Sequence, residues 1–350
     1  MIKKKQVWIE SLRIFALFWV IYNHTAGFGY SLYENAALSP VETAVNLLLC
    51  VFCRVSVPLF LMISGALLLG RDEPIKKTTR RIFRMVILIV VVVCANYAYY
   101  FSIHHEYANN IHSILDFVKE LYGGTNLCTY YLWLYLGFLI CLPLLQEIAK
   151  RRALLPYSAI LYVVIVQLLP LLELRFSWPS FNLKAYGGFF AVYYICPLIG
   201  YWLESSEEIF TRKILLGVNG LAVISFALNT WIGFWSWNVY GTTWLLLPTV
   251  LSACMFYDAK YFSRSGACAR LCEKRFYPAL EKVILALSPQ TLGTFLLSGV
   301  LMWKVFPVYT YLQATTSATF AALGWVLVSM LFCQAVTAVL RLIPFMKKLL

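Results

Sequence analysis

Long apolar runs separated by short polar segments dominate the 350-residue chain. A run of roughly 18 or more apolar residues predicts a transmembrane helix. The pattern therefore predicts an all-α, polytopic membrane bundle of about ten transmembrane helices, forming a single domain over residues 1–350. The second span is long enough to tilt or to break near Pro58. The predicted spans are 7–30, 41–69, 83–103, 128–148, 153–173, 187–204, 213–234, 240–262, 280–303 and 317–345.

The composition supports a membrane protein. Hydrophobic residues make up 61% of the chain, charged residues only 13%, and the mean hydropathy is +0.74. A soluble domain carries about a quarter charged residues. Aromatic residues, at 17%, are typical of belts at the two membrane interfaces. The apolar run that follows Lys3–Lys5 is too long for a signal peptide, so we expect the first span to be retained.

The distribution of basic residues orients the predicted bundle. Most of the 29 Lys and Arg residues fall in alternate loops, which are therefore predicted to be cytoplasmic together with both termini. This pattern predicts a multi-pass protein of the cell (plasma or inner) membrane. The net charge of +13 then reflects topology and lipid contact, and no nucleic-acid partner is expected. The basic segment 260–282 is expected to contact anionic lipid.

Ionisable residues inside the first predicted span are the strongest functional signal. Glu10, Arg13 and His24 all lie within it. Such groups are costly at membrane depth, so they normally face a bundle interior or a watery cavity. Eleven positions separate Arg13 from His24, which places both on one helix face about 16 Å apart. Glu10 lies one turn from Arg13 and can compensate its charge.

Arg54 is the other charge within a predicted span. It either lines the same cavity or forms a structural ion pair, with Glu42 as a candidate partner. The intramembrane residues alone permit two classes of protein. One is a membrane enzyme; the other is a transporter that uses Arg13, Arg54 and His24 as a substrate or proton relay.

The ten cysteines do not predict a metal site. Most lie in apolar spans, where cysteine behaves as a small hydrophobic residue. Cys50 and Cys53 form a C-x-x-C, but no second pair follows at zinc spacing. His104, His105 and His112 cluster in a predicted outer loop, where a solvated loop is favoured over a metal site. No metal is expected.

Four motifs occur in order along the first half of the chain. Arg13 and His24 form an Arg-x10-His pair in the first span. The second span carries RVSVPLFLMISGALLL (54–69), which includes Ser64 and Gly65. The third begins with RIFR (81–84), and the fourth carries YYLWLYLGFLICLPLL (130–145). In this order and on these spans, the motifs resemble those of the acyltransferase-3 family of integral membrane acyltransferases, over nearly the whole chain.

The resemblance implies a stand-alone membrane O-acetyltransferase. It implies that an acetyl (acyl) group passes from cytoplasmic acetyl-CoA to a hydroxyl of a cell-surface glycan or lipid-linked sugar. His24 would act as general base or form an acetyl-imidazole intermediate, and the sequence does not choose between these. Arg13 and Glu10 would support it from the same helix.

The resemblance also implies a path for the donor. Arg81 and Arg84, with Arg80 beside them, would bind the CoA phosphates at the cytoplasmic mouth. Arg54 and Ser64 would line the channel, with the Ser64 hydroxyl able to polarise the thioester carbonyl. Gly65 would permit close packing of helices or donor.

Two positions depart from the family's pattern. Many members carry Asp where this chain has Glu10, which keeps the charge. Near the ninth span, Ser298 stands where a histidine often falls, so a mechanism with two histidines is not expected here.

Overall fold

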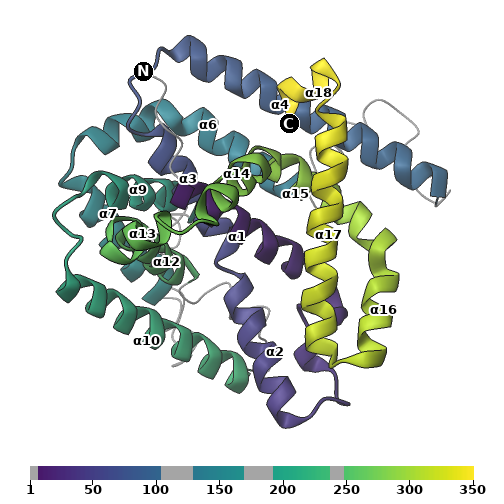
Figure 1. Ribbon diagram of the computed structural model, residues 1–350. Coiled ribbons are helices and arrows are strands. Elements are labelled where there is room, and N and C mark those ends of the chain that lie inside the picture. The colour runs from purple at the N-terminus through teal and green to yellow at the C-terminus, as the bar shows by residue number, and fades with distance from the viewer. Residues whose placement is uncertain (1–6, 104–128, 169–191, 237–247) are drawn as a thin grey trace.

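The computed structural model describes residues 7–103, 129–168, 192–236 and 248–350 (Figure 1). Every regular element in these ranges is a helix, as the sequence predicts. The α-helices are α1 (Val7–Asn23), α2 (Pro40–Cys53), α3 (Ser56–Leu68), α4 (Ile75–Ile103), α6 (Thr129–Lys150), α7 (Leu154–Tyr162), α9 (Val192–Ser205), α10 (Arg212–Ser236), α12 (Pro248–Arg264), α13 (Gly266–Cys272), α14 (Tyr277–Leu287), α15 (Thr291–Leu301), α16 (Phe306–Thr315), α17 (Ala318–Leu340) and α18 (Pro344–Leu349). Shorter helical segments are η1 (Ala26–Phe28), η2 (Leu32–Glu34), η4 (Val163–Leu168), η6 (Ser288–Gln290) and η7 (Met302–Val305).

Four helical stretches in the described ranges are long and apolar enough to cross a membrane. Large apolar side chains on the outer faces of α10 and α17 are exposed, as expected of surfaces that meet lipid. The chain is therefore a helical membrane bundle, while ten spans with cytoplasmic termini stay a prediction. The four stretches are Pro40–Leu68, Tyr130–Lys150, Tyr277–Thr315 and Ala318–Leu340.

The first helix is shorter than predicted. It ends at Asn23, so the prediction of one helix over residues 7–30 is wrong. The Thr25 hydroxyl donates to the carbonyl of Tyr22 at 2.7 Å and accepts from the backbone N–H of Tyr30 at 2.7 Å. These bonds replace the helical ladder with a tight turn, in which Ala26 has a φ of 48°. His24 consequently sits at the inner edge of a turn, just beyond the end of the helix.

Proline breaks two of the predicted spans. A proline cannot donate to the carbonyl four residues earlier and its ring collides with that carbonyl. For Pro58 this residue is Arg54, and α2 indeed ends at Cys53 with Arg54 as its C-cap, before α3 begins. Of the two outcomes that the sequence allowed for this span, a tilt or a break near Pro58, the break is observed. The span 280–303, in contrast, was predicted to be continuous, and it is split at Ser288–Pro289 by η6.

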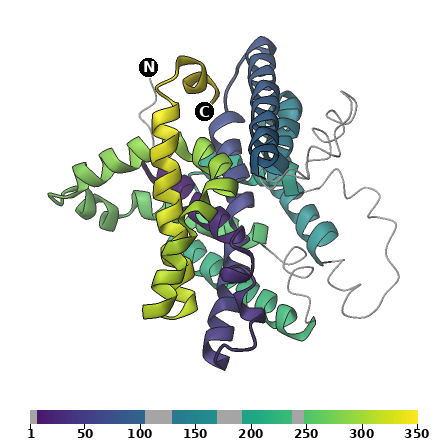
Figure 2. The same cartoon turned by 90° about the vertical axis from the view of Figure 1, so that its right-hand side faces the viewer.

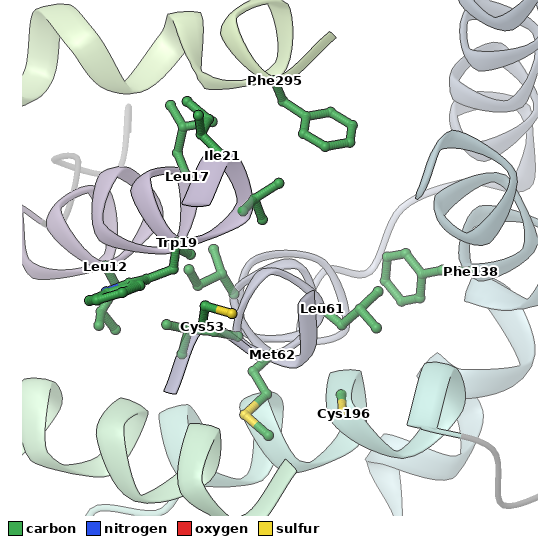
Figure 3. Packing of buried hydrophobic residues seen from close by; sticks show 14 of the residues in the cluster. Leu12, Leu17, Trp19, Ile21, Cys53, Leu61, Met62, Phe138, Cys196 and Phe295 are labelled. Atoms are coloured by element: carbon green, nitrogen blue, oxygen red, sulfur yellow. The ribbon is translucent and has the colours of Figure 1, made fainter. Parts of the chain in front are cut away.

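The centre of the bundle is the contact between α3 and α9. A Cβ added at Gly65 would overlap the backbone carbonyl of Pro197, and one added at Gly200 would overlap the carbonyl of Met62. Two small residues therefore let the backbones touch, as is typical of helix pairs in membranes. Figure 3 shows α3 between its neighbours, with Leu61 pointing toward Phe138. The prediction that Gly65 permits close packing is confirmed.

The C-terminal helices form a second group beside α1. α16, which the sequence did not predict, packs along α17 (Figure 2). Aromatic rings fill the space between them: Phe306 and Tyr309 stack at 5.3 Å, and Trp325 lies edge-on to Phe306 at 5.1 Å. The chain then turns so that α18 contacts α4, where Arg84 donates to the carbonyl of Leu349 at 3.0 Å.

Candidate functional site

A cavity of about 690 Å³ lies between α1, α3, α6, α12 and α15. This volume falls in the range of ordinary ligand pockets. Four residues predicted from the sequence line it: Arg13, His24, Arg54 and Ser64. Because Arg13 lies on α1 and His24 directly follows its last residue, the cavity runs along the C-terminal part of that helix.

At one end of the cavity, Arg13 is held by a carboxylate and a hydroxyl. Its Nη1 lies 2.7 Å from Oε2 of Glu10, which confirms the predicted pair, and 3.3 Å from Oγ of Ser288. Ser288 in turn donates to the same Glu10 oxygen. Glu10 and Ser288 are buried, whereas the Arg13 side chain is 23% exposed and reaches the cavity. A buried charge compensated in this way presents one fixed guanidinium to a ligand.

At the other end lies His24. Its Nδ1 is buried, and no hydrogen-bond partner for it is present among the described residues. The ring faces Phe295 of α15, with ring centroids 6.3 Å apart. An unsatisfied polar atom on a cavity wall is costly unless a ligand or water meets it. Because His24 also lines the cavity, its imidazole is next to any molecule that occupies this end.

Arg54 belongs to the same end. It is buried, its guanidinium lies 4.6 Å from the centre of the Tyr30 ring, and Nη2 donates to the Tyr30 hydroxyl. Glu42 is not placed for the suggested ion pair, because it forms the capping box with Ser39 at the opposite end of α2. Of the two readings of Arg54, the cavity position is the one observed.

Between the Arg13 end and the His24 end, the cavity is lined by residues of α3, α4 and α6. The Ser64 hydroxyl donates to the carbonyl of Phe60 at 2.9 Å and lies on the wall. Tyr135 of α6 and Met85 of α4 also line the cavity. The arginines of α4 are not part of the lining.

The arginines of the predicted clamp lie on the first turns of α4, and two of them contact other groups of the protein. Arg81 makes an ion pair with Glu73 at 2.6 Å, and Arg84 binds the Leu349 carbonyl. Arg80 is exposed. Met85, the residue after Arg84, lines the cavity, whereas the three arginines do not. A ligand that bound these arginines would have to exchange with Glu73 and the C-terminal backbone.

Glu73 is expected to make stability depend on pH under acid conditions. Although burial raises its pKa, hydrogen bonds and charge from Arg81 and Lys77 prevail and hold the pKa at about 2, below the ordinary 4.5. The ionised carboxylate therefore stabilises the fold above about pH 4.5, and this contribution is lost as the pH falls toward 2. Thermal unfolding of the wild type and Glu73→Gln should differ near neutrality and converge in acid. A difference that does not change with pH would contradict this pairing.

Several wall residues were not predicted. Aromatic residues were interpreted as interfacial anchors, yet Tyr30, Tyr131 and Phe295 line the cavity. Ser288, which contacts Arg13 and Glu10 but does not line the cavity, was also not predicted; its one usable signal was a Ser-Pro pair that interrupts an apolar run. Cys53 was assigned a packing role, and its buried thiol donates to the Cys50 carbonyl at 3.1 Å on the cavity wall.

Other sequence-predicted features fall elsewhere. The histidines 104, 105 and 112 lie outside the described residues. Within the described ranges, no group of three or more His, Cys, Asp and Glu could hold a metal ion. The basic segment 260–282 is largely helical, comprising the end of α12, α13 and the start of α14.

Comparison with known families decides the class of protein. The family model described as "Acyltransferase domain", that of the acyltransferase-3 family, matches residues 6–338. The chain belongs to the acyltransferase-3 family. It is thus a membrane acyltransferase, which favours the enzyme over the transporter that the intramembrane charges also permit. No curated protein and no solved structure gave a significant match.

One position of this acyltransferase, Ser298, was expected from the sequence to depart from the pattern of the family. Ser298, which stands where a histidine is frequent, is fully buried and donates to the Phe295 carbonyl of its own helix at 2.7 Å. It offers no second imidazole to the cavity. Among the described cavity-lining residues, His24 is the only histidine.

Proposed function

We propose that this acyltransferase moves an acetyl group from cytoplasmic acetyl-CoA to a hydroxyl of a glycan or lipid-linked sugar on the outer side of the cell membrane. The observation that carries the proposal is the cavity itself, because it connects the guanidinium of Arg13 to the imidazole of His24. A donor that enters at one end and an acceptor that arrives at the other can meet only if such a space exists.

The donor enters beside α4. Arg81 and Arg84, with the exposed Arg80, bind its phosphates, since arginine forks match phosphate oxygens. The pantetheine arm then passes Tyr135 and Ser64 toward His24. Arg13, fixed by Glu10 and Ser288, binds a polar group of that arm. Most of the residues that line the cavity are apolar or aromatic, as suits the alkyl parts of this chain.

His24 acts on the acceptor hydroxyl. It takes the hydroxyl proton while the oxygen attacks the thioester carbonyl; the C–S bond breaks, and the proton passes to the departing thiolate of CoA. The Arg54 guanidinium, which lies at the same end of the cavity as His24, stabilises the negative charge that develops on the carbonyl oxygen, while Ser64 lines the path of the donor arm. An acetyl-imidazole route uses the same residues, with His24 as nucleophile.

The test is transfer of label. Purified protein, incubated with acetyl-CoA labelled in the acetyl group and with lipid-linked saccharides from the source membrane, should produce labelled saccharide and free CoA thiol in equal amounts. The proposal would be refuted if the protein transferred no label and released no CoA thiol with any acyl-CoA.

The double variant Arg81→Ala plus Arg84→Ala should lose donor binding. Each charge-assisted bond to phosphate contributes about 1.5–3 kcal/mol, so the Kd for CoA, measured by calorimetry, should rise by at least about tenfold. The matched control is Arg212→Ala plus Lys213→Ala, which removes the same charge from exposed positions on α10. Equal weakening in both double variants would show a general charge effect and no clamp.

A further inference from the structure

Aromatic rings enclose the space next to His24. The Phe295 ring lies 6.3 Å from the imidazole, centroid to centroid, and meets the Tyr131 ring edge-on at 5.4 Å. Tyr131 in turn lies 6.0 Å from the ring of Phe60. All four residues line the cavity. A group bound at His24 on this side would therefore touch Phe295 first.

Phe295 is held firmly in this position. It is 7% exposed and packs in the core, and Figure 3 shows its ring projecting from α15 away from the helix. The backbone carbonyl of Phe295 accepts the Ser298 hydroxyl, while Arg341 of α17 donates to the Pro289 carbonyl just before α15. The second bond ties the start of α15 to α17, and α15 packs against both α1 and α17, so neighbouring helices restrict movement of the ring.

We propose that Phe295, backed by Tyr131, limits the length of the acyl group that this enzyme transfers to a short one such as acetyl. This inference rests on the proposed function. A thioester carbonyl at His24 directs its alkyl chain into the surrounding wall, and the wall on the α15 side is an aromatic ring. Each methylene in a tight apolar pocket changes selectivity by about 10–200-fold. A chain with two additional methylenes that is directed toward α15 would have to displace this ring.

The test compares acyl donors of different length. Wild type and Phe295→Ala are assayed with acetyl-CoA and butyryl-CoA, and the ratio of kcat/KM for butyryl to that for acetyl is determined. We expect this ratio to rise by at least about tenfold in the variant. Phe295→Leu, which removes less volume and keeps more packing, should give a smaller rise in the same direction and serves if the alanine variant does not fold.

The control is Leu296→Ala. Leu296 is equally buried at 7% on the same helix, but it does not line the cavity. Its truncation should lower stability and leave the ratio unchanged. A ratio that is unchanged in both Phe295 variants, or that rises equally in Leu296→Ala, would overturn the inference. If the wild type transfers no acyl group from either donor, the proposed function itself has failed, and the two failures are thereby distinguishable.

Discussion

His24→Ala is expected to abolish acyl transfer while donor binding persists. A positioned general base contributes about 10²–10⁴-fold to the rate, and no other described residue on the cavity wall carries an imidazole. The side chain is only half-buried and its Nδ1 makes no bond within the described structure, so its removal should cost little stability. Label transfer from acetyl-CoA and calorimetric binding of CoA measure the two quantities separately.

A matched variant separates chemistry from packing at this position. His24→Gln keeps polarity and approximate size but cannot carry a proton, so it should be as inactive as the alanine variant and should bind CoA normally. Transfer that survives in His24→Gln would show that the imidazole fills space and performs no proton transfer. If labelled protein can be trapped by acid quenching in the wild type but not in His24→Gln, this result would favour the acetyl-imidazole route.

Gly65→Val is expected to cause the largest loss of stability of any single substitution considered. The Cβ that the substitution adds at Gly65 would by itself overlap the carbonyl of Pro197. This carbonyl belongs to the backbone of α9 and cannot rotate away. The two helices would have to separate, and overpacking of this kind typically costs about 1–3 kcal/mol or more. Because α3 also carries Ser64, the cavity would be distorted. Thermal unfolding in detergent should show a lowered midpoint and a smaller folded fraction.

Gly217→Ala provides the opposite control. Gly217 lies within α10, and a Cβ there would meet no atom within 4 Å. Alanine is favoured over glycine in a helix interior by about 0.8–1 kcal/mol, so this variant should unfold at a higher temperature than the wild type. If both glycine variants were destabilised alike, the close approach of α3 to α9 would not be the cause.

The sequence predicted the helical class because long apolar runs leave few alternatives. It also allowed for the break at Pro58, since the consequence of a missing N–H is local. It did not predict where the first helix ends. The helix ends where the Thr25 hydroxyl forms bonds across a turn. The same hydroxyl could bond within a longer helix, and the position of Tyr30 decides which of the two arrangements forms.

The same distinction applies to the site. Spacing on one helix was sufficient to place Glu10 next to Arg13 and to put His24 on the same side. Ser288 contacts that pair from a position 275 residues beyond Arg13, and its Ser-Pro pair does not indicate which distant residues it meets. The engagement of Arg81 by Glu73 was likewise missed, because a loop carboxylate pairs according to how the loop folds over the helix start.

The central claim is that one continuous passage beside α1 brings the acyl donor to His24. The most direct measurement is a cryo-electron microscopy structure of the protein with CoA bound. We predict nucleotide density at Arg81 and Arg84, pantetheine density along Arg13 and Ser64, and the sulfur within about 3.5 Å of the imidazole or one water away from it. CoA bound elsewhere, with the space beside His24 closed off from α4, would contradict the account.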